Sequence, residues 1–286
     1  MSTAAPLWQC VHRALDLRAP VVMGVLNVTP DSFSDGGRFS DIDAALRHSR
    51  RLVEEGAAII DVGGESTRPG AAPASSSEEL DRVIPVIRAI RRESPVFISV
   101  DTSKPEVMQA AVEAGADIIN DVRALGEPGA LEAAARSRAG ICLMHMQGEP
   151  RTMQQAPHYR DVVAEVHDFL HRRLDAATAA GVARERLVAD PGFGFGKRVA
   201  DNLELLKQLG QLGALEVPLL VGLSRKSLLA KITGRDVDHR VAGSVALASI
   251  AVLNGARIVR AHDVAGTVDA IRVAAAVIKG EDFDGT

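Results

Sequence analysis

Polar side chains that could do chemistry recur along this chain at one kind of position, directly after a short apolar run. Asp101 follows the apolar residues 96–100, for example, and Asp190 follows residues 187–189. Short apolar runs with polar residues behind them are typical of buried strands that end in a loop. If the fold brings these ends together, the side chains form one polar pocket. The set is Asn27, Asp61, Asp101, Asn120, His145, Asp190, Lys226, Arg260 and His262.

One group within this set offers hydrogen-bond donors and acceptors between aliphatic strands. It consists of Asp101, Asn120, Asp190 and Lys226. A carboxylate that faces a ring N–H and an exocyclic amine forms two charge-assisted hydrogen bonds, so the group suits a planar heterocycle. The structural alternatives are helix capping by the two aspartates, satisfaction of backbone groups by Asn120, and a surface position for Lys226.

A second group has the chemistry of an anion site. Arg260 and His262 alternate at the end of the last apolar run, so their side chains point the same way. Asn27 ends the first apolar run, which neighbours the last one if the strands close into a barrel. A cation, an imidazole and an amide fit a phosphate or pyrophosphate, and the Asn27 oxygen suits a Mg²⁺ that keeps most of its waters. Arg68 is either a further anion contact or a loop salt bridge, and a lone histidine at a strand end is often only a structural hydrogen bonder.

Two loops are unusual in composition. Residues 29–37 are polar, end in two glycines and carry one aromatic, Phe33, which suits a loop that closes over a ligand; an ordinary strand-to-helix connection is the alternative. The stretch DPGFGFGK at residues 190–197 lacks the phosphate-loop pattern GxxxxGK[ST], because Pro191 and Arg198 occupy two of its positions. Its glycines are better explained as room for a flat ligand beside the backbone.

Several other polar or aromatic residues are expected to support the fold. We expect His145 to have a packing role and Asp61 to be structural or to support a site residue. Trp8, Cys10 and Cys142 are expected to fill space in the core.

Eight apolar runs alternate with segments of helical periodicity. The predicted strands cover residues 21–26, 59–62, 96–100, 117–119, 141–144, 187–189, 219–223 and 257–259. The predicted helices cover residues 43–55, with Asp41 as N-cap, and 77–92, 105–114, 129–137, 159–180, 202–209, 241–256 and 266–278. This order predicts an α/β fold, a single (β/α)8 TIM barrel with its active site at the C-terminal ends of the strands. An open doubly wound sheet would bring only some of the polar residues together.

The predicted barrel forms one domain over residues 1–286, with residues 1–19 as an N-terminal extension and residues 280–286 as a tail. Hydrophobic residues make up 47% of the chain and aromatics only 3%, as expected for parallel strands covered by helices. The net charge of −4 gives no reason to expect a nucleic-acid partner.

The same composition bears on compartment. Two distant cysteines favour a reduced cytoplasmic protein. The first residues lack the pattern of a secretory signal, and the longest charge-free run, residues 241–256, is too short to span a membrane. We therefore expect no membrane partner, and a buried or dimer-facing helix at 241–256.

Eight motifs together give the chain a family resemblance, in order, over about residues 21–277. They are NVTPDSFSDGG (27–37), DVGGESTRPGA (61–71), SVDTSKPEV (99–107), INDVR (119–123), LMHMQG (143–148), DPGFGFGK (190–197), GLSRKS (222–227) and RAHDV (260–264). On these motifs the chain resembles the bacterial dihydropteroate synthases. The resemblance implies condensation of 6-hydroxymethyl-7,8-dihydropterin pyrophosphate with p-aminobenzoate, giving 7,8-dihydropteroate and pyrophosphate. It also implies a Mg²⁺ ion and a homodimer.

The resemblance assigns residues to three binding roles. For the pterin ring it implies Asp101, Asn120, Asp190, Lys226 and Met144. For the pyrophosphate it implies Asn27, Arg68, Arg260 and His262, with Asn27 as the metal ligand. For p-aminobenzoate it implies Thr67, Pro69, Phe195, Ser224 and Phe33. The catalytic set is expected to be Asp101, Lys226, Arg260 and His262 with Phe33 and Asp35 on the closing loop.

Two rival functions share part of this pocket. A pterin-dependent methyltransferase on the same barrel would use Asp101, Asn120 and Asp190 but would require a corrinoid partner and no anion site at Arg260. A catalytically silent pterin-binding paralogue would retain the pocket without the reaction.

Overall fold

Eight parallel strands form the central sheet of the computed structural model, which describes residues 7–29, 37–65 and 74–280, with only the backbone for residues 37–40. The strands are β3 (Val21–Asn27), β4 (Ile59–Gly63), β5 (Phe97–Asp101), β6 (Ile118–Asp121), β7 (Gly140–Met144), β8 (Leu187–Asp190), β9 (Leu220–Val221) and β10 (Ile258–Ala261). They pair in the order β8-β7-β6-β5-β4-β3-β10-β9. A parallel bridge between Ala189 and Leu219 joins the two outer strands, and the Ala189 N–H donates to the Pro218 carbonyl over 3.0 Å. The predicted barrel is therefore confirmed, and the open sheet is excluded.

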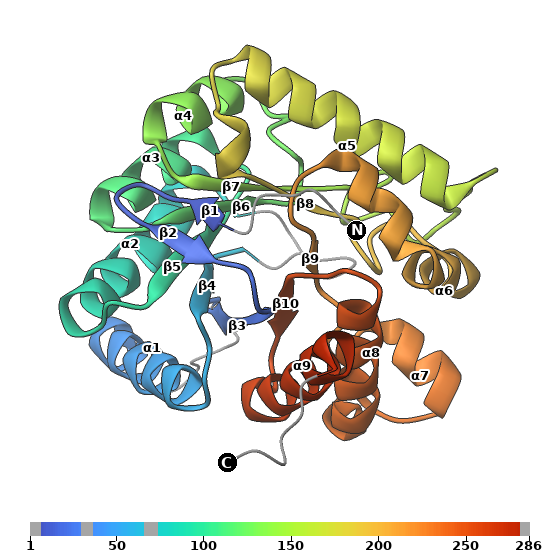
Figure 1. The fold of residues 1–286 in the computed structure, drawn as a ribbon. Helices are drawn as coiled ribbons and strands as arrows, with labels where there is room; N and C mark the ends of the chain where they lie inside the picture. Colours follow the sequence, from blue (N-terminus) through green and yellow to red (C-terminus); the bar gives the residue numbers. More distant parts are fainter. Residues whose placement is uncertain (1–6, 30–36, 66–73, 281–286) are drawn as a thin grey trace.

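Helices form an outer ring around these strands (Figure 1). They are α1 (Gly37–Glu54), α2 (Ser76–Glu93), α3 (Pro105–Ala114), α4 (Ala130–Ser137), α5 (Val162–Ala179), α6 (Val199–Lys207), α7 (Ser227–Thr233), α8 (Val241–Leu253) and α9 (Val264–Lys279). Local signals set their ends: α3 begins at Pro105 and stops at Gly115, whose φ of 114° suits only a residue without a Cβ.

Three differences between the predicted and observed elements lie in the barrel itself. Helix α1 begins at Gly37, so the expectation of an N-cap at Asp41 was wrong, and Asp41 lies inside the helix. Strand β9 has two residues, fewer than predicted, because the barrel closes there by a single bridge. Helix α7 was not predicted, since its seven residues are too few to show helical periodicity.

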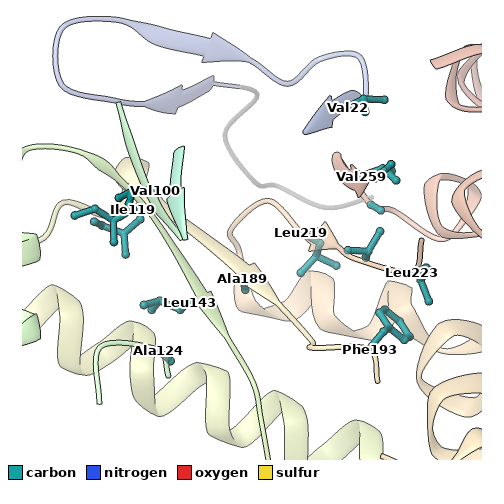
Figure 2. Packing of buried hydrophobic residues seen from close by; sticks show 14 of the residues in the cluster. Val22, Val100, Ile119, Ala124, Leu143, Ala189, Phe193, Leu219, Leu223 and Val259 are labelled. Carbon is teal, nitrogen blue, oxygen red and sulfur yellow. The ribbon is translucent and has the colours of Figure 1, made fainter. Parts of the chain in front are cut away.

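Outward-facing strand residues pack against the helices. Figure 2 shows Val100, Ile119 and Leu143 from three neighbouring strands within this layer, and Val22 and Val259 from the two strands that pair on the other side. Because these side chains alternate with inward-facing ones, burial of this layer fixes which residues of each strand reach the barrel interior.

The lower half of the interior is filled by apolar side chains and by a hairpin that the sequence did not predict. The strand residues are Met23, Ile59, Ile118, Cys142, Val188, Leu220 and Ile258. The hairpin consists of β1 (Leu7–Gln9) and β2 (Ala14–Asp16), and its Trp8 is fully buried, with the indole N–H donating to the Arg186 carbonyl over 2.8 Å. The space-filling roles of Trp8, Cys10 and Cys142 are confirmed. Residues 7–16 thus cap the N-terminal end of the barrel, which leaves the opposite end as its mouth.

Across residues 7–29, 37–65 and 74–280, no helix is both long enough and apolar enough to cross a membrane.

Candidate active site

The strand register places the predicted polar residues at one level of the mouth. Asn27 pairs with Gly63, Gly63 with Asp101, and Asp101 with Asn120, so four neighbouring strands end in one row. Across the barrel, Asp190 pairs with Met144. Residues far apart in sequence therefore share one site, as the barrel prediction requires.

Arg260 lies at the centre of this site and contacts two carboxylates. Its Nε is 2.6 Å from Asp61 Oδ2, and its Nη2 is 2.9 Å from Asp101 Oδ2. Asp61 also accepts a hydrogen bond of 3.3 Å from Asn120 Nδ2 and is fully buried, while its Oδ1 has no partner among the described residues. The expected supporting role of Asp61 is confirmed: it orients Arg260 and Asn120. The residues expected to bind a heterocycle and those expected to bind an anion are connected by the contact of Arg260 with Asp101.

Two other aspartates of the mouth, Asp101 and Asp190, hold protons more tightly than ordinary carboxyls. Burial raises the pKa of Asp101 to about 7, against the opposing effect of Arg260. Burial raises the pKa of Asp190 to about 6, although the Gly192 N–H, which donates to Oδ1 over 2.7 Å, lowers it. Neither residue caps a helix, since α3 is preceded by Lys104 and α6 by Arg198. Perturbed carboxyls in a cleft are typical of functional sites.

Lys226 completes the heterocycle side of the mouth. It is half-buried, and its Nζ lies 4.1 Å from the centre of the Phe195 ring, a cation–π contact. Burial, with Arg260 as the next cause, lowers the pKa of Lys226 to about 8. The alternative of a solvated surface lysine is therefore excluded.

His262 and Ser224 form a contact at the ends of β10 and β9. Ser224 Oγ accepts from the His262 N–H over 3.2 Å and lies 3.1 Å from Nδ1 of the ring. Burial and then Arg260 and Arg225 lower the pKa of His262 to about 4, so the ring is neutral at pH 7. The residues expected to contact pyrophosphate and p-aminobenzoate are direct neighbours here.

A backbone turn that the sequence reasoning missed directs two of these side chains. Arg225 has a φ of 56°, a left-handed conformation that is rare outside glycine. It is held by an ion pair with Asp263 and by a 3.0 Å hydrogen bond from its N–H to Ser244 Oγ. The turn sends Ser224 towards the mouth on one side and Lys226 on the other. The only signal in the sequence was its position between two site residues.

Asn27 offers one oxygen to a cation. A Cβ built on Gly63 would lie 3.5 Å from Asn27 Oδ1, so the bare glycine leaves room beside that oxygen. Within the described residues, no cluster of three or more His, Cys, Asp or Glu side chains could hold a metal alone. A single amide oxygen with free space beside it fits a Mg²⁺ ion that keeps most of its waters.

His145 and Lys197 form a buried contact that no sequence spacing indicated. Lys197 Nζ lies 2.9 Å from His145 Nδ1, and burial lowers the pKa of His145 to about 2. The ring also packs edge-on against Phe169 at 4.9 Å between centroids. The packing role of His145 is confirmed, but it has a polar partner. The position of Lys197 behind three glycines was the available clue.

Five expected site residues lie outside the residues that the structure describes. They are Phe33, Asp35, Thr67, Arg68 and Pro69.

Comparison with known proteins connects this site to one family. Residues 23–262 match the family described as pterin binding enzyme. The chain is 52% identical over 269 residues to the dihydropteroate synthase of Escherichia coli K12, covering 94% of this chain and 95% of that protein. It superposes on a Yersinia pestis dihydropteroate synthase with a sulfonamide drug complex at a TM-score of 0.91 and 50% identity, covering 96% of this chain and 99% of that one.

A third relative was solved with one of the expected substrates and with the expected product. The Xanthomonas albilineans dihydropteroate synthase is 54% identical in its structure with 4-aminobenzoic acid and 52% identical in its structure with 7,8-dihydropteroate. The TM-scores are 0.90 and 0.87, and each covers 96% of this chain and 99% of that one.

Proposed function

This chain belongs to the pterin-binding enzyme family, as one of its dihydropteroate synthases, and we propose how its barrel mouth divides the work of that reaction. The enzyme condenses 6-hydroxymethyl-7,8-dihydropterin pyrophosphate with p-aminobenzoate, giving 7,8-dihydropteroate and pyrophosphate in folate biosynthesis. The observation that carries the division is the salt bridge of Arg260 with Asp61 and Asp101, which lies between the two groups of polar residues.

In this proposal the pterin ring binds in the interior half of the mouth. Asp101, Asn120 and Asp190 present oxygens and an amide at the ends of β5, β6 and β8. A carboxylate facing the ring N–H and the exocyclic amine gives a paired, charge-assisted interaction. Met144, which is buried beside Asp190, walls the ring, and Lys226 donates to its acceptor edge.

The pyrophosphate binds at the outer half, near β3 and β10. Arg260 and His262 face it from one strand, with Asn27 on the neighbouring strand and Arg68 outside the described residues. Asn27 would hold Mg²⁺ together with water and pyrophosphate oxygens. The bound ion would supply neutralisation of the charge that develops on the departing group. Arg260 contributes a fixed positive charge to the same end, because its guanidinium is oriented in advance by two carboxylates.

The p-aminobenzoate binds between Phe195 and Ser224, where the loop residues Phe33, Thr67 and Pro69 complete the site in this proposal. Its aniline nitrogen attacks the methylene carbon of the pterin as the carbon–oxygen bond to pyrophosphate breaks, and the nitrogen then loses a proton to solvent. Asp101, next to the ring, offsets positive charge that develops on the pterin. We also propose that residues 29–37, of which 30–36 including Asp35 lie outside the described residues, close over the site and exclude water. A sulfonamide like the drug in the Yersinia pestis structure would compete for this place.

The assembly and surroundings follow from other features. We propose that the chain forms a homodimer through α8 and α9, where Ile250, Leu253, Val273, Val277 and Ile278 are 43–68% exposed. We propose that it forms one domain over residues 1–286 and acts in the cytoplasm, where its two free cysteines would remain reduced.

The test is the formation of 7,8-dihydropteroate from the purified protein. The proposal expects product only when pterin pyrophosphate, p-aminobenzoate and Mg²⁺ are all present, and loss of product after chelation with EDTA. Full activity in EDTA would refute the metal assignment and leave the reaction itself standing. No product under any condition would favour the catalytically silent paralogue, whereas methyl transfer with a corrinoid partner would favour the methyltransferase.

A further inference from the structure

Lys197, at the end of the glycine-rich segment 190–197, is buried with its amine among three neutral partners. The residue is 3% exposed. Its Nζ lies 2.8 Å from the Gly192 carbonyl, 3.2 Å from the Phe195 carbonyl and 2.9 Å from His145 Nδ1. An ammonium has three N–H donors, so these three partners use its whole donor capacity when the ring proton of His145 is on Nε2.

A buried lysine with no carboxylate bonded to it is costly for the folded protein. Burial lowers the pKa of Lys197 to about 7, with Asp190 opposing that change and Lys226 adding to it. Lysine is almost never fully buried unless it is paired. The compensation here includes a donor for the Phe195 carbonyl, whereas the Gly192 carbonyl also accepts from the Phe195 N–H over 3.1 Å.

The backbone on the N-terminal side of Lys197 packs closely against a neighbouring segment, at positions where only glycine fits. Gly192 and Gly196 have φ values of 67° and 59°, in the left-handed region. A Cβ at Gly192 would lie 1.9 Å from the His145 carbonyl oxygen, and one at Gly196 would lie 2.2 Å from the Gln147 carbonyl oxygen. The segment therefore lies directly against residues 145–147, with its carbonyls turned towards Lys197.

The residues whose carbonyls bind Lys197 are the same residues that contact the site. The N–H of Gly192 donates to Asp190 Oδ1 over 2.7 Å. The ring of Phe195 lies 4.1 Å from Lys226 Nζ. Lys197 thus binds the carbonyls of two residues, Gly192 and Phe195. Gly192 also holds Asp190, and Phe195 also contacts Lys226.

The geometry points to Lys197 as a positioning residue of the synthase reaction, which fixes Asp190, Phe195 and Lys226 through the 191–196 backbone without touching a substrate. This inference rests on the proposed roles of those three residues. In this inference, the buried amine of Lys197 sets the distance between Asp190 on the pterin side of the mouth and Phe195 on the p-aminobenzoate side.

The test compares Lys197→Met with Lys207→Met, an exposed lysine on α6 whose side chain is 76% accessible. Loss of exact positioning in a preorganised site costs about tenfold or more, so KM for p-aminobenzoate should rise about tenfold in Lys197→Met while kcat falls less. Hydrogen exchange of the 192–196 amides should accelerate, with exchange in the strands unchanged. Lys207→Met should match the wild type in both measurements.

Two outcomes would overturn the inference. One is a folded Lys197→Met protein with wild-type KM and wild-type exchange of the 192–196 amides. The other is faster exchange with no change in KM, which would reduce Lys197 to a structural contact. If Lys197→Met does not fold, His145→Leu removes one of the three partners; the same change in KM at smaller size supports the inference, and an unchanged KM refutes it.

The exchange measurement also separates this inference from the proposed function. A wild-type protein that forms no dihydropteroate would refute the proposed reaction. In that case, calorimetry can still measure how p-aminobenzoate binds to wild type and to Lys197→Met in the presence of pyrophosphate. Weaker binding to the variant would support the inference that Lys197 orders the segment for ligand binding. Equal binding would refute it.

Discussion

Arg260 Nη2 lies 2.9 Å from Asp101 Oδ2, although the strands that carry them, β10 and β5, are separated in the barrel by β3 and β4. The long guanidinium side chain crosses the mouth, while its Nε is held by Asp61 from β4. One arginine thus connects the carboxylate expected at the pterin with the strand expected at the pyrophosphate. In the proposed reaction the same guanidinium would contact both the departing anion and the carboxylate beside the ring.

Removal of this arginine should destabilise the protein as well as inactivate it. Arg260→Ala leaves Asp61 and Asp101 buried without their cation, which typically costs about 3–5 kcal/mol in the free energy of unfolding. The loss should be smaller at pH 5 than at pH 8, because burial raises the pKa of Asp101 to about 7 and its protonation at pH 5 relieves the unpaired charge. Urea unfolding at both pH values checks this, with the exposed Arg257→Ala as control. Equal losses at the two pH values would contradict it.

Ionised Asp190 should lower the free energy of unfolding at neutral and high pH. Its folded pKa of about 6 lies above the ordinary value of 3.8, so its stabilising effect is present at low pH and is lost as the pH rises through 6. Asp190→Asn should therefore increase the free energy of unfolding at pH 8, on the order of 1–3 kcal/mol, and change it little below pH 4. Thermal unfolding across this range measures the effect. A variant that is less stable than wild type at pH 8 would refute it.

His262 should make the protein less stable in acid. Its folded pKa of about 4 lies below the ordinary 6.5, so its contribution is complete above pH 6.5 and is lost as the pH falls through 4. Relative to His262→Gln, the wild type should lose on the order of 2–3 kcal/mol between pH 7 and pH 4. Urea unfolding of both proteins gives the difference. His171, which is exposed on α5, supplies the control substitution, and the same difference there would count against a specific role for His262.

The hairpin that caps the barrel should contribute stability without contributing to catalysis. Trp8→Ala removes a fully buried indole and its hydrogen bond to the Arg186 carbonyl, which should cost about 3–5 kcal/mol. The KM values of the folded fraction should stay near those of wild type, because the mouth is at the opposite end. Leu7→Ala, at an exposed position of the same strand, should have little effect. A changed KM in Trp8→Ala would show that the two ends are coupled.

The barrel could be predicted because two features of the sequence mark each strand: an apolar run and a polar residue at its end. The polar residues at the strand ends therefore lie together at the mouth, as predicted. They are Asn27, Asp101, Asn120, Asp190, Arg260 and His262. The partners of these residues were harder to predict, because an Arg260–Asp101 contact depends on side-chain length and on the barrel radius.

The elements that were missed lacked any periodic signal. Strands β1 and β2 have three residues each, so alternation cannot be read from them. Lys197 and His145 are 52 residues apart, and their contact exists only because the glycines of 192–196 allow the backbone to approach residues 145–147. Contacts of this kind follow from packing and not from local sequence.

We propose that separate residues of one mouth hold the two halves of the pterin pyrophosphate. Calorimetric titration of wild type, Arg260→Ala and Asp190→Ala with pyrophosphate, and then with a pterin lacking it, tests this directly. We predict that Arg260→Ala loses affinity for pyrophosphate and that Asp190→Ala loses affinity for the pterin. Wild-type affinities for both ligands in both variants would contradict the account.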